Sequence, residues 1–273
     1  MYKWILKSVL ALTLAAGLTA GTGATANAAA AQAPSWVDAS YAKQGTVGVH
    51  YGGAASKRHK VMIAKAGTVY TYDLSQAKRA EIFPLQSGSG SYEVTLLEQI
   101  SGTSYKKIGS TSVQLQASGA NRVFLGSVQN VNWKESASAT ALAKKLTAGK
   151  KTDRAKAEAV HRYVTAQIRY DFAKAKSLGG AYLPSADGTL ASKTGICYDY
   201  SSLMAVMLRS SGVPTKLVMG KTTYVKEYHA WNEIYLNGRW VTVDATVDAA
   251  YKQAGQKVSF AKDSGKYSVQ KVY

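Results

Sequence analysis

The stretch TGICYDYSSLMAVMLRSSGVP, residues 194–214, sets the fold of the second half of the chain. Its middle, residues 203–208, is apolar around most of a helical turn, which indicates a buried helix. Gly212 suits the left-handed position that follows a helix end, and Pro214 prevents the helix from continuing. We therefore expect a central helix with Cys197 at or just inside its N-terminus.

Cys197 is the single cysteine of the chain. One cysteine can form neither an internal disulfide nor a multi-thiolate zinc site. At a helix N-terminus the backbone N–H groups and the macrodipole favour a negative charge, and a thiolate is a nucleophile. A lone cysteine is more often buried and inert, but Gly195 and the helix start favour a reactive role here.

A second stretch, HAWNEIYLNGRWVTVDAT, residues 229–246, predicts a hairpin, because Asn237-Gly238 separates two β-rich runs. A two-residue turn sets Leu236 opposite Arg239, and counting back sets Trp231 opposite Asp244. His229 then shares a sheet face with Asp244 as its diagonal neighbour, roughly 7–8 Å away at the backbone and within reach of a hydrogen bond. The opposite face carries apolar residues expected to pack on the core: Ile234, Leu236, Val241, Val243 and Ala245. Residues 215–220 predict a strand between the helix and this hairpin.

A thiol, an imidazole and a carboxylate that orients the imidazole are the groups of thiol acyl-transfer chemistry. In this hypothesis His229 takes the proton of Cys197, Asp244 holds the imidazole in one tautomer, and the thiolate attacks a carbonyl to give a thioester. A backbone N–H at the helix start could donate to the oxyanion. Tyr182 and Trp231 are candidates for a side-chain donor, with packing the simpler role for each.

These motifs resemble those of the bacterial transglutaminase-like superfamily: Gly195-Ile-Cys-Tyr-Asp-Tyr, Arg209-Ser-Ser-Gly-Val-Pro214, His229-Ala-Trp-Asn-Glu233 and Trp240-Val-Thr-Val-Asp244-Ala-Thr246. The resemblance covers about residues 136–248. It implies a papain-like fold and a catalytic triad of Cys197, His229 and Asp244. The last motif has Ala245 where the family has proline, a change that should matter little.

The resemblance leaves the reaction open, because superfamily members include crosslinking acyltransferases, peptidases, amidases and proteins without activity. The first hypothesis is acyl transfer from a glutamine carboxamide, or a peptide carbonyl, to an amine. The second is a cysteine peptidase or amidase that uses the same three residues with water as acceptor. The third is a non-catalytic module that binds the cell wall, and the intact set of three residues argues against it.

No cofactor is expected, and the sequence predicts no metal requirement. The run HAWNE lacks the spacing of the HExxH zinc motif, and no acidic loop has the spacing of a calcium site.

The remaining sequence completes an α+β fold with a catalytic domain at residues 136–273. Helices are expected at 137–146, before Gly149, and from Thr152 or Asp153 to about Arg169. Val160, Val164 and Ile168 mark the buried side of the second helix, and His161 beside them is expected to be a partly buried helix residue. The segment from about residue 171 to Cys197 is expected to be a polar loop.

Residues 35–131 are expected to form a β-sandwich-like accessory domain, because short strands alternate with frequent turns. A tight turn is predicted at Ala66-Gly67, and His50 and His59 are expected to be surface or strand residues. Strands are predicted at 46–51, 60–65, 68–72, 91–97, 105–108 and 112–115.

Residues 1–28 have the pattern of a secretory signal peptide, with Lys3 and Lys7 before an apolar run and the small-x-small site Ala26-Asn-Ala28. We therefore expect a secreted protein, extracellular or associated with the cell wall. No later stretch is apolar for long enough to predict a transmembrane helix.

The chain of 273 residues carries 34 Lys and Arg against 16 Asp and Glu, a formal charge of +18. Cleavage after Ala28 would remove two lysines and no acid, and so leave +16. Such a charge suits an anionic cell-wall polymer as a possible partner, beside a protein or peptide substrate. No nucleic-acid-binding motif is present, so nucleic acid is not an expected partner. The composition excludes collagen-like and broadly disordered chains.

Overall fold

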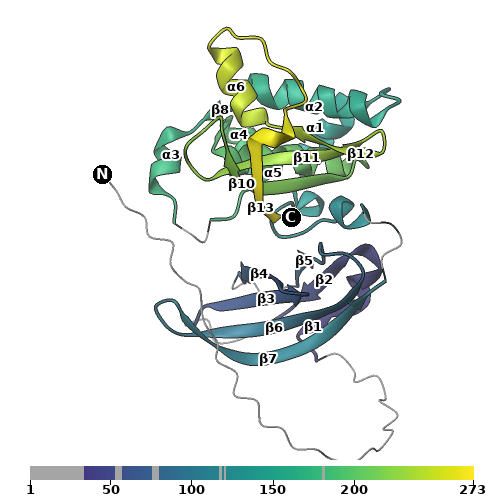
Figure 1. Cartoon of the computed structure of the whole chain (residues 1–273), viewed down its shortest axis with the longest axis vertical. Helices are drawn as coiled ribbons and strands as arrows, with labels where there is room; N and C mark the ends of the chain where they lie inside the picture. The colour runs from purple at the N-terminus through teal and green to yellow at the C-terminus, as the bar shows by residue number, and fades with distance from the viewer. Residues whose placement is uncertain (1–33, 53–56, 76–79, 117–118, 120, 180–181) are drawn as a thin grey trace, which may run out of the picture. The chain divides into compact units, whose positions relative to one another are not determined.

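The fold is known from a computed structural model, which describes residues 34–52, 57–75, 80–116, 119, 121–179 and 182–273 (Figure 1). The expected signal peptide, residues 1–28, lies outside the described residues. In the part of the chain that the structure describes, no helix is both long and apolar enough to cross a membrane.

The second half of the chain is built on one helix against one antiparallel sheet, as predicted. Helix α5, Cys197–Ser210, begins at the cysteine. The strands run in the order β12 (Arg239–Val243), β11 (His229–Leu236), β10 (Thr215–Thr222) and β13 (Tyr267–Val272). Every residue of α5 from Asp199 to Arg209 is buried, so the helix forms the centre of the core.

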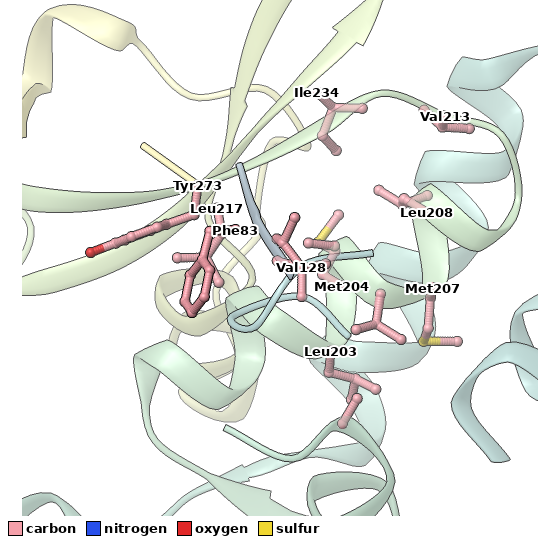
Figure 2. Packing of buried hydrophobic residues seen from close by; sticks show 14 of the residues in the cluster. Phe83, Val128, Leu203, Met204, Met207, Leu208, Val213, Leu217, Ile234 and Tyr273 are labelled. Carbon is pink, nitrogen blue, oxygen red and sulfur yellow. The ribbon is translucent and has the colours of Figure 1, made fainter. Parts of the chain in front are cut away.

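Apolar side chains of α5 explain this central position. Figure 2 shows Leu203, Met204, Met207 and Leu208 in one cluster with Leu217 of β10 and Ile234 of β11. Burying each side chain of this size contributes about 1.5–3 kcal/mol, so the helix and sheet hold each other in place.

The β11–β12 hairpin has the predicted turn and register. Asn237 and Gly238 have φ angles of 51° and 81°, and Leu236 pairs with Arg239. The expected continuation of the second strand to Thr246 was wrong, because β12 ends at Val243 and helix α6, Ala245–Gln253, follows. The Asp244 side chain caps this helix by accepting hydrogen bonds from two backbone N–H groups of its first turn. These N–H groups would lack this acceptor if the strand continued past Val243. Ala245 is buried as predicted, but as a helix residue.

Two predicted helices are present, α1 (Ala137–Thr147) and α2 (Asp153–Gln167), the second capped by the Thr152 side chain. The expected stripe on α2 is buried: Val160, Val164 and Ile168. His161 is buried beside it, and its Nε2 lies 2.8 Å from Oδ2 of Asp248 on α6.

The expected loop before Cys197 was wrong in part, since it contains further elements. These are α3 (Phe172–Ser177), α4 (Ala186–Ser192) and a parallel pair of strands, β8 (Arg169–Tyr170) and β9 (Thr194–Gly195). Asp171 and Ser185 cap the two short helices through their side chains, which are local signals that the sequence prediction passed over.

The N-terminal part contains two antiparallel sheets. One has the order β1 (Val37–Asp38), β2 (Thr46–Val49), β5 (Glu81–Pro84), and the other the order β4 (Thr68–Asp73), β3 (His59–Lys65), β6 (Gly90–Ser101), β7 (Ser104–Leu115). Short 3-10 turns complete the chain: η1 (Ala39–Gln44), η2 (Arg122–Leu125), η3 (Trp133–Glu135) and η4 (Ser264–Lys266).

The tight turn at Ala66-Gly67 is confirmed, with φ angles of 47° and 80°. The expected break between residues 108 and 112 was wrong, because β7 pairs with β6 along most of its length. His59 lies in β3, and His50 is exposed. The division into domains at 35–131 and 136–273 stays a prediction, because Phe83 and Val128 join the same cluster as Leu203 (Figure 2).

Candidate functional site

Cys197 is a free, partly buried cysteine at the first position of α5. The Ile196 N–H group donates to Oδ2 of Asp199 at 2.9 Å, which closes the first turn of the helix. The thiol therefore lies at the positive end of the helix macrodipole, where a thiolate is stabilised.

His229 begins β11 and is only 4% exposed. Its Nε2 lies 2.8 Å from Oδ2 of Asp244, so Nδ1 is the ring nitrogen left for Cys197. Burial lowers the pKa of His229, but hydrogen bonds to Asp244 and Cys197 outweigh burial and raise that pKa to about 10. The imidazole is therefore protonated at neutral pH, between a carboxylate and a thiol.

Asp244 is fully buried and receives four hydrogen bonds. Its Oδ2 accepts from His229 and from the Tyr267 hydroxyl at 3.0 Å, and its Oδ1 accepts from the N–H groups of Thr246 and Val247 at 3.1 and 3.0 Å. A carboxylate held by four donors has one orientation, so the ring of His229 has one as well.

Tyr267 is a residue that the sequence prediction missed. Burial, followed by the charge of Asp244, raises the pKa of the Tyr267 hydroxyl, which therefore remains a donor. It lies on β13, where Tyr267 pairs with Thr222 of β10.

The two candidate oxyanion donors have different surroundings. The Trp231 ring stacks at 6.4 Å from that of His229, and within the described residues its buried Nε1 has no hydrogen-bond partner. The Tyr182 hydroxyl donates to Asp199 and accepts from Lys174 at 2.5 Å. Its proton is therefore already used in a hydrogen bond to Asp199 and not offered to an oxyanion.

Two further polar residues join α5 to its sheet. Asn232 of β11 donates from Nδ2 to the carbonyls of Ser201 and Lys216, both at 3.0 Å. Buried Arg209 donates to the carbonyls of Thr215, Gly126 and Tyr273 at 2.7, 2.9 and 2.7 Å. Both belong to the motifs noted in the sequence, but their contacts were not predicted.

The structure thus brings the three predicted residues, Cys197, His229 and Asp244, into one site. Among the residues described, no group of three or more His, Cys, Asp or Glu side chains could hold a metal ion.

Residues 140–245 match the family model described as the transglutaminase-like superfamily. This region belongs to that superfamily. All three site residues lie within this transglutaminase-like region. Among curated proteins, none matches the sequence.

Several solved structures are similar to this chain. A presumed cysteine protease from Cytophaga hutchinsonii is 18% identical, over 82% of this chain and 78% of its own, with a TM-score of 0.43. The periplasmic domain of TgpA from Pseudomonas aeruginosa is 16% identical, over 81% and 96%, with a TM-score of 0.41. Red sea bream transglutaminase is 11% identical, over 74% and 48%, with a TM-score of 0.28.

Proposed function

We propose that this protein is a thiol acyl-transfer enzyme of the transglutaminase type, with Cys197 as nucleophile, His229 as acid and base, and Asp244 as the residue that orients the imidazole. The observation that carries the proposal is the position of His229, whose Nε2 is 2.8 Å from Asp244 and whose pKa responds to Cys197. A buried imidazole coupled to both a carboxylate and a thiol has the arrangement of an activated nucleophile.

In the acylation step, the Cys197 thiolate attacks the carboxamide carbon of a glutamine side chain. The carbonyl oxygen becomes an oxyanion, to which backbone N–H groups in the first turn of α5 can donate. When the oxyanion collapses, the C–N bond breaks and the leaving ammonia takes the proton from His229. The raised pKa of His229 supports this step, because it keeps that proton on the ring at neutral pH.

In the second step, a lysine amine attacks the thioester and His229 accepts its proton. The C–S bond breaks, an isopeptide bond forms and the thiolate is regenerated next to the imidazolium. If water attacks instead, the same intermediate yields a carboxylic acid, and the protein is an amidase or peptidase. The two reactions differ only in the acceptor.

The test is incubation of the purified protein with a glutamine peptide and a labelled primary amine, followed by mass mapping of Cys197. We expect amine incorporation, an acyl adduct on Cys197, and loss of both in Cys197→Ala. Release of free acid with no amine product would favour the hydrolase. If Cys197→Ala, or full alkylation of the thiol, leaves activity unchanged, both enzyme proposals are wrong and the wall-binding module remains.

We also propose that the protein acts outside the cytoplasm, since residues 1–28 resemble a secretory signal peptide. The charge of +16 that cleavage would leave supports contact with an anionic cell-wall polymer. Fractionation of the producing cells tests the first point. Sedimentation of the protein with isolated cell walls, with and without their anionic polymer, tests the second.

A further inference from the structure

Asp199 lies two residues after Cys197 and has no part in the reaction proposed above, yet its carboxylate is completely buried. Its Oδ2 accepts from the Ile196 N–H at 2.9 Å and from Lys174 Nζ at 2.8 Å, and its Oδ1 accepts from the Tyr182 hydroxyl. Lys174 also donates to the Tyr182 oxygen. We call Asp199, Lys174 and Tyr182 the Asp199 cluster.

Gly195 gives this carboxylate its place. A Cβ atom at Gly195 would lie 2.6 Å from Cβ of Asp199, which is closer than two non-bonded carbon atoms approach in proteins. The side chain of Asp199 can therefore fold back over the start of α5 only because residue 195 has none. Gly195, which the sequence shows two residues before Cys197, thus makes room for the Asp199 carboxylate.

The cluster connects the start of α5 to helix α3, which carries Lys174. No residue of α3 is buried, and Phe172 at its start is 72% exposed. An element without buried side chains has little apolar packing to hold it, so polar contacts set its position. Lys174 supplies such a contact through an ion pair whose carboxylate end is fully buried.

Helix α3 is also connected to the segment that leads into the proposed nucleophile. Tyr170 of β8 lies two residues before the start of α3. It pairs with Gly195 of β9 and packs edge-on against Phe172, with ring centroids 4.9 Å apart. Burial, followed by the negative charge of Cys197, raises the pKa of Tyr170 to about 12. Through its pairing with Gly195, Tyr170 joins the chain before α3 to the chain just before Cys197.

We propose that Asp199 is a positioning residue for acyl transfer, an inference that rests on the proposed function. Through Ile196 it holds the first turn of α5, and with it Cys197. Through Lys174 it holds α3 beside the thiol, where the helix forms one wall of the site that receives the polypeptide acyl donor. The cluster thus links the position of the nucleophile to the binding of its substrate.

Lys174→Met tests the second link without disturbing the hydrogen bond between Asp199 and Ile196. We expect KM for the glutamine peptide to rise about fivefold or more, with kcat and the rate of Cys197 alkylation by iodoacetamide within about twofold of wild type. Hydrogen exchange of the α3 amides should quicken about tenfold. Lys174→Arg should restore KM and the α3 exchange rates to near wild type. Lys176→Met replaces an exposed lysine on the same helix and should change neither KM nor α3 exchange.

Asp199→Asn tests the first link, and there we expect the alkylation rate of Cys197 to fall about fivefold or more. An unchanged KM and unchanged α3 exchange in Lys174→Met would overturn the proposal even if Asp199→Asn fails to fold. Faster exchange with an unchanged KM would also overturn the role of α3 as a substrate wall. If wild-type protein turns over no substrate, the proposed function fails, and the exchange and alkylation measurements still decide whether the cluster holds α3 and Cys197.

Discussion

The hydroxyl of Tyr267 lies 3.0 Å from Oδ2 of Asp244, the oxygen that also faces the His229 ring. The tyrosine approaches from β13 and the histidine from β11, so the carboxylate joins two strands that are not neighbours in the sheet. Because Oδ1 is occupied by the N–H groups at the start of α6, Asp244 cannot rotate to release either donor. Tyr267 is therefore part of what orients His229.

Tyr267→Phe removes this donor and keeps the ring. A hydrogen bond to a charged group contributes about 1.5–3 kcal/mol, so we expect kcat/KM for amine incorporation to fall about tenfold or more. Tyr224→Phe is the matched control, since its ring lies 5.7 Å from that of Tyr267 and, among the described residues, it makes no hydrogen bond to Asp244. Steady-state kinetics of the two variants check the prediction, and equal effects would contradict it.

Asp244 has two separable roles, which two substitutions can distinguish. Asp244→Asn retains an oxygen that can cap α6 but presents an amide to His229, so we expect kcat/KM to drop by about a thousandfold or more. Asp244→Ala loses the cap as well and should cost about 1 kcal/mol more in the free energy of unfolding. Kinetics together with urea unfolding measure both effects. Similar stability in the two variants would show that Asp244 does not cap α6.

The raised pKa of His229 predicts how stability depends on pH. Its pKa changes from an ordinary value of 6.5 to about 10 in the folded protein, so the folded state binds this proton more tightly. The resulting stabilisation is fully present below pH 6.5 and is lost as pH rises through about 10. Urea unfolding at the two ends of this interval should show a larger loss for wild type than for His229→Gln. Equal losses would mean that the pKa of His229 is not raised by folding.

Much of the site could be predicted because its signals are local. The Asn237-Gly238 turn sets the register of β11 and β12, and counting from it brings His229 to Asp244. The apolar run before Gly212 predicts the helix that starts at Cys197. Each inference spans fewer than about twenty residues, over which backbone periodicity is a reliable guide.

The rest depends on contacts that no local pattern encodes. Tyr267 reaches Asp244 only because β13 pairs with β10. In the sequence β11, β12 and α6 lie between these two strands. The end of β12 was misjudged because Val243 and Thr246 have high β propensity, while the capping by Asp244 overrides it. Residues that act by joining distant segments therefore appear only in the structure.

Arg209 provides the sharpest test of such a long-range role. Its guanidinium is buried and donates to three carbonyls, those of Thr215, Gly126 and Tyr273, from three separate segments. Arg209→Met keeps the apolar stem but leaves the three oxygens without this donor, and we expect the free energy of unfolding to fall by about 3 kcal/mol or more. Arg209→Lys should rescue little, because a single ammonium cannot reproduce the planar fork of donors. Arg162→Met, at an exposed position on α2, should stay within about 0.5 kcal/mol of wild type. Urea unfolding of the three variants measures this, and a loss in Arg209→Met no larger than that in Arg162→Met would show that Arg209 does not hold the three segments together.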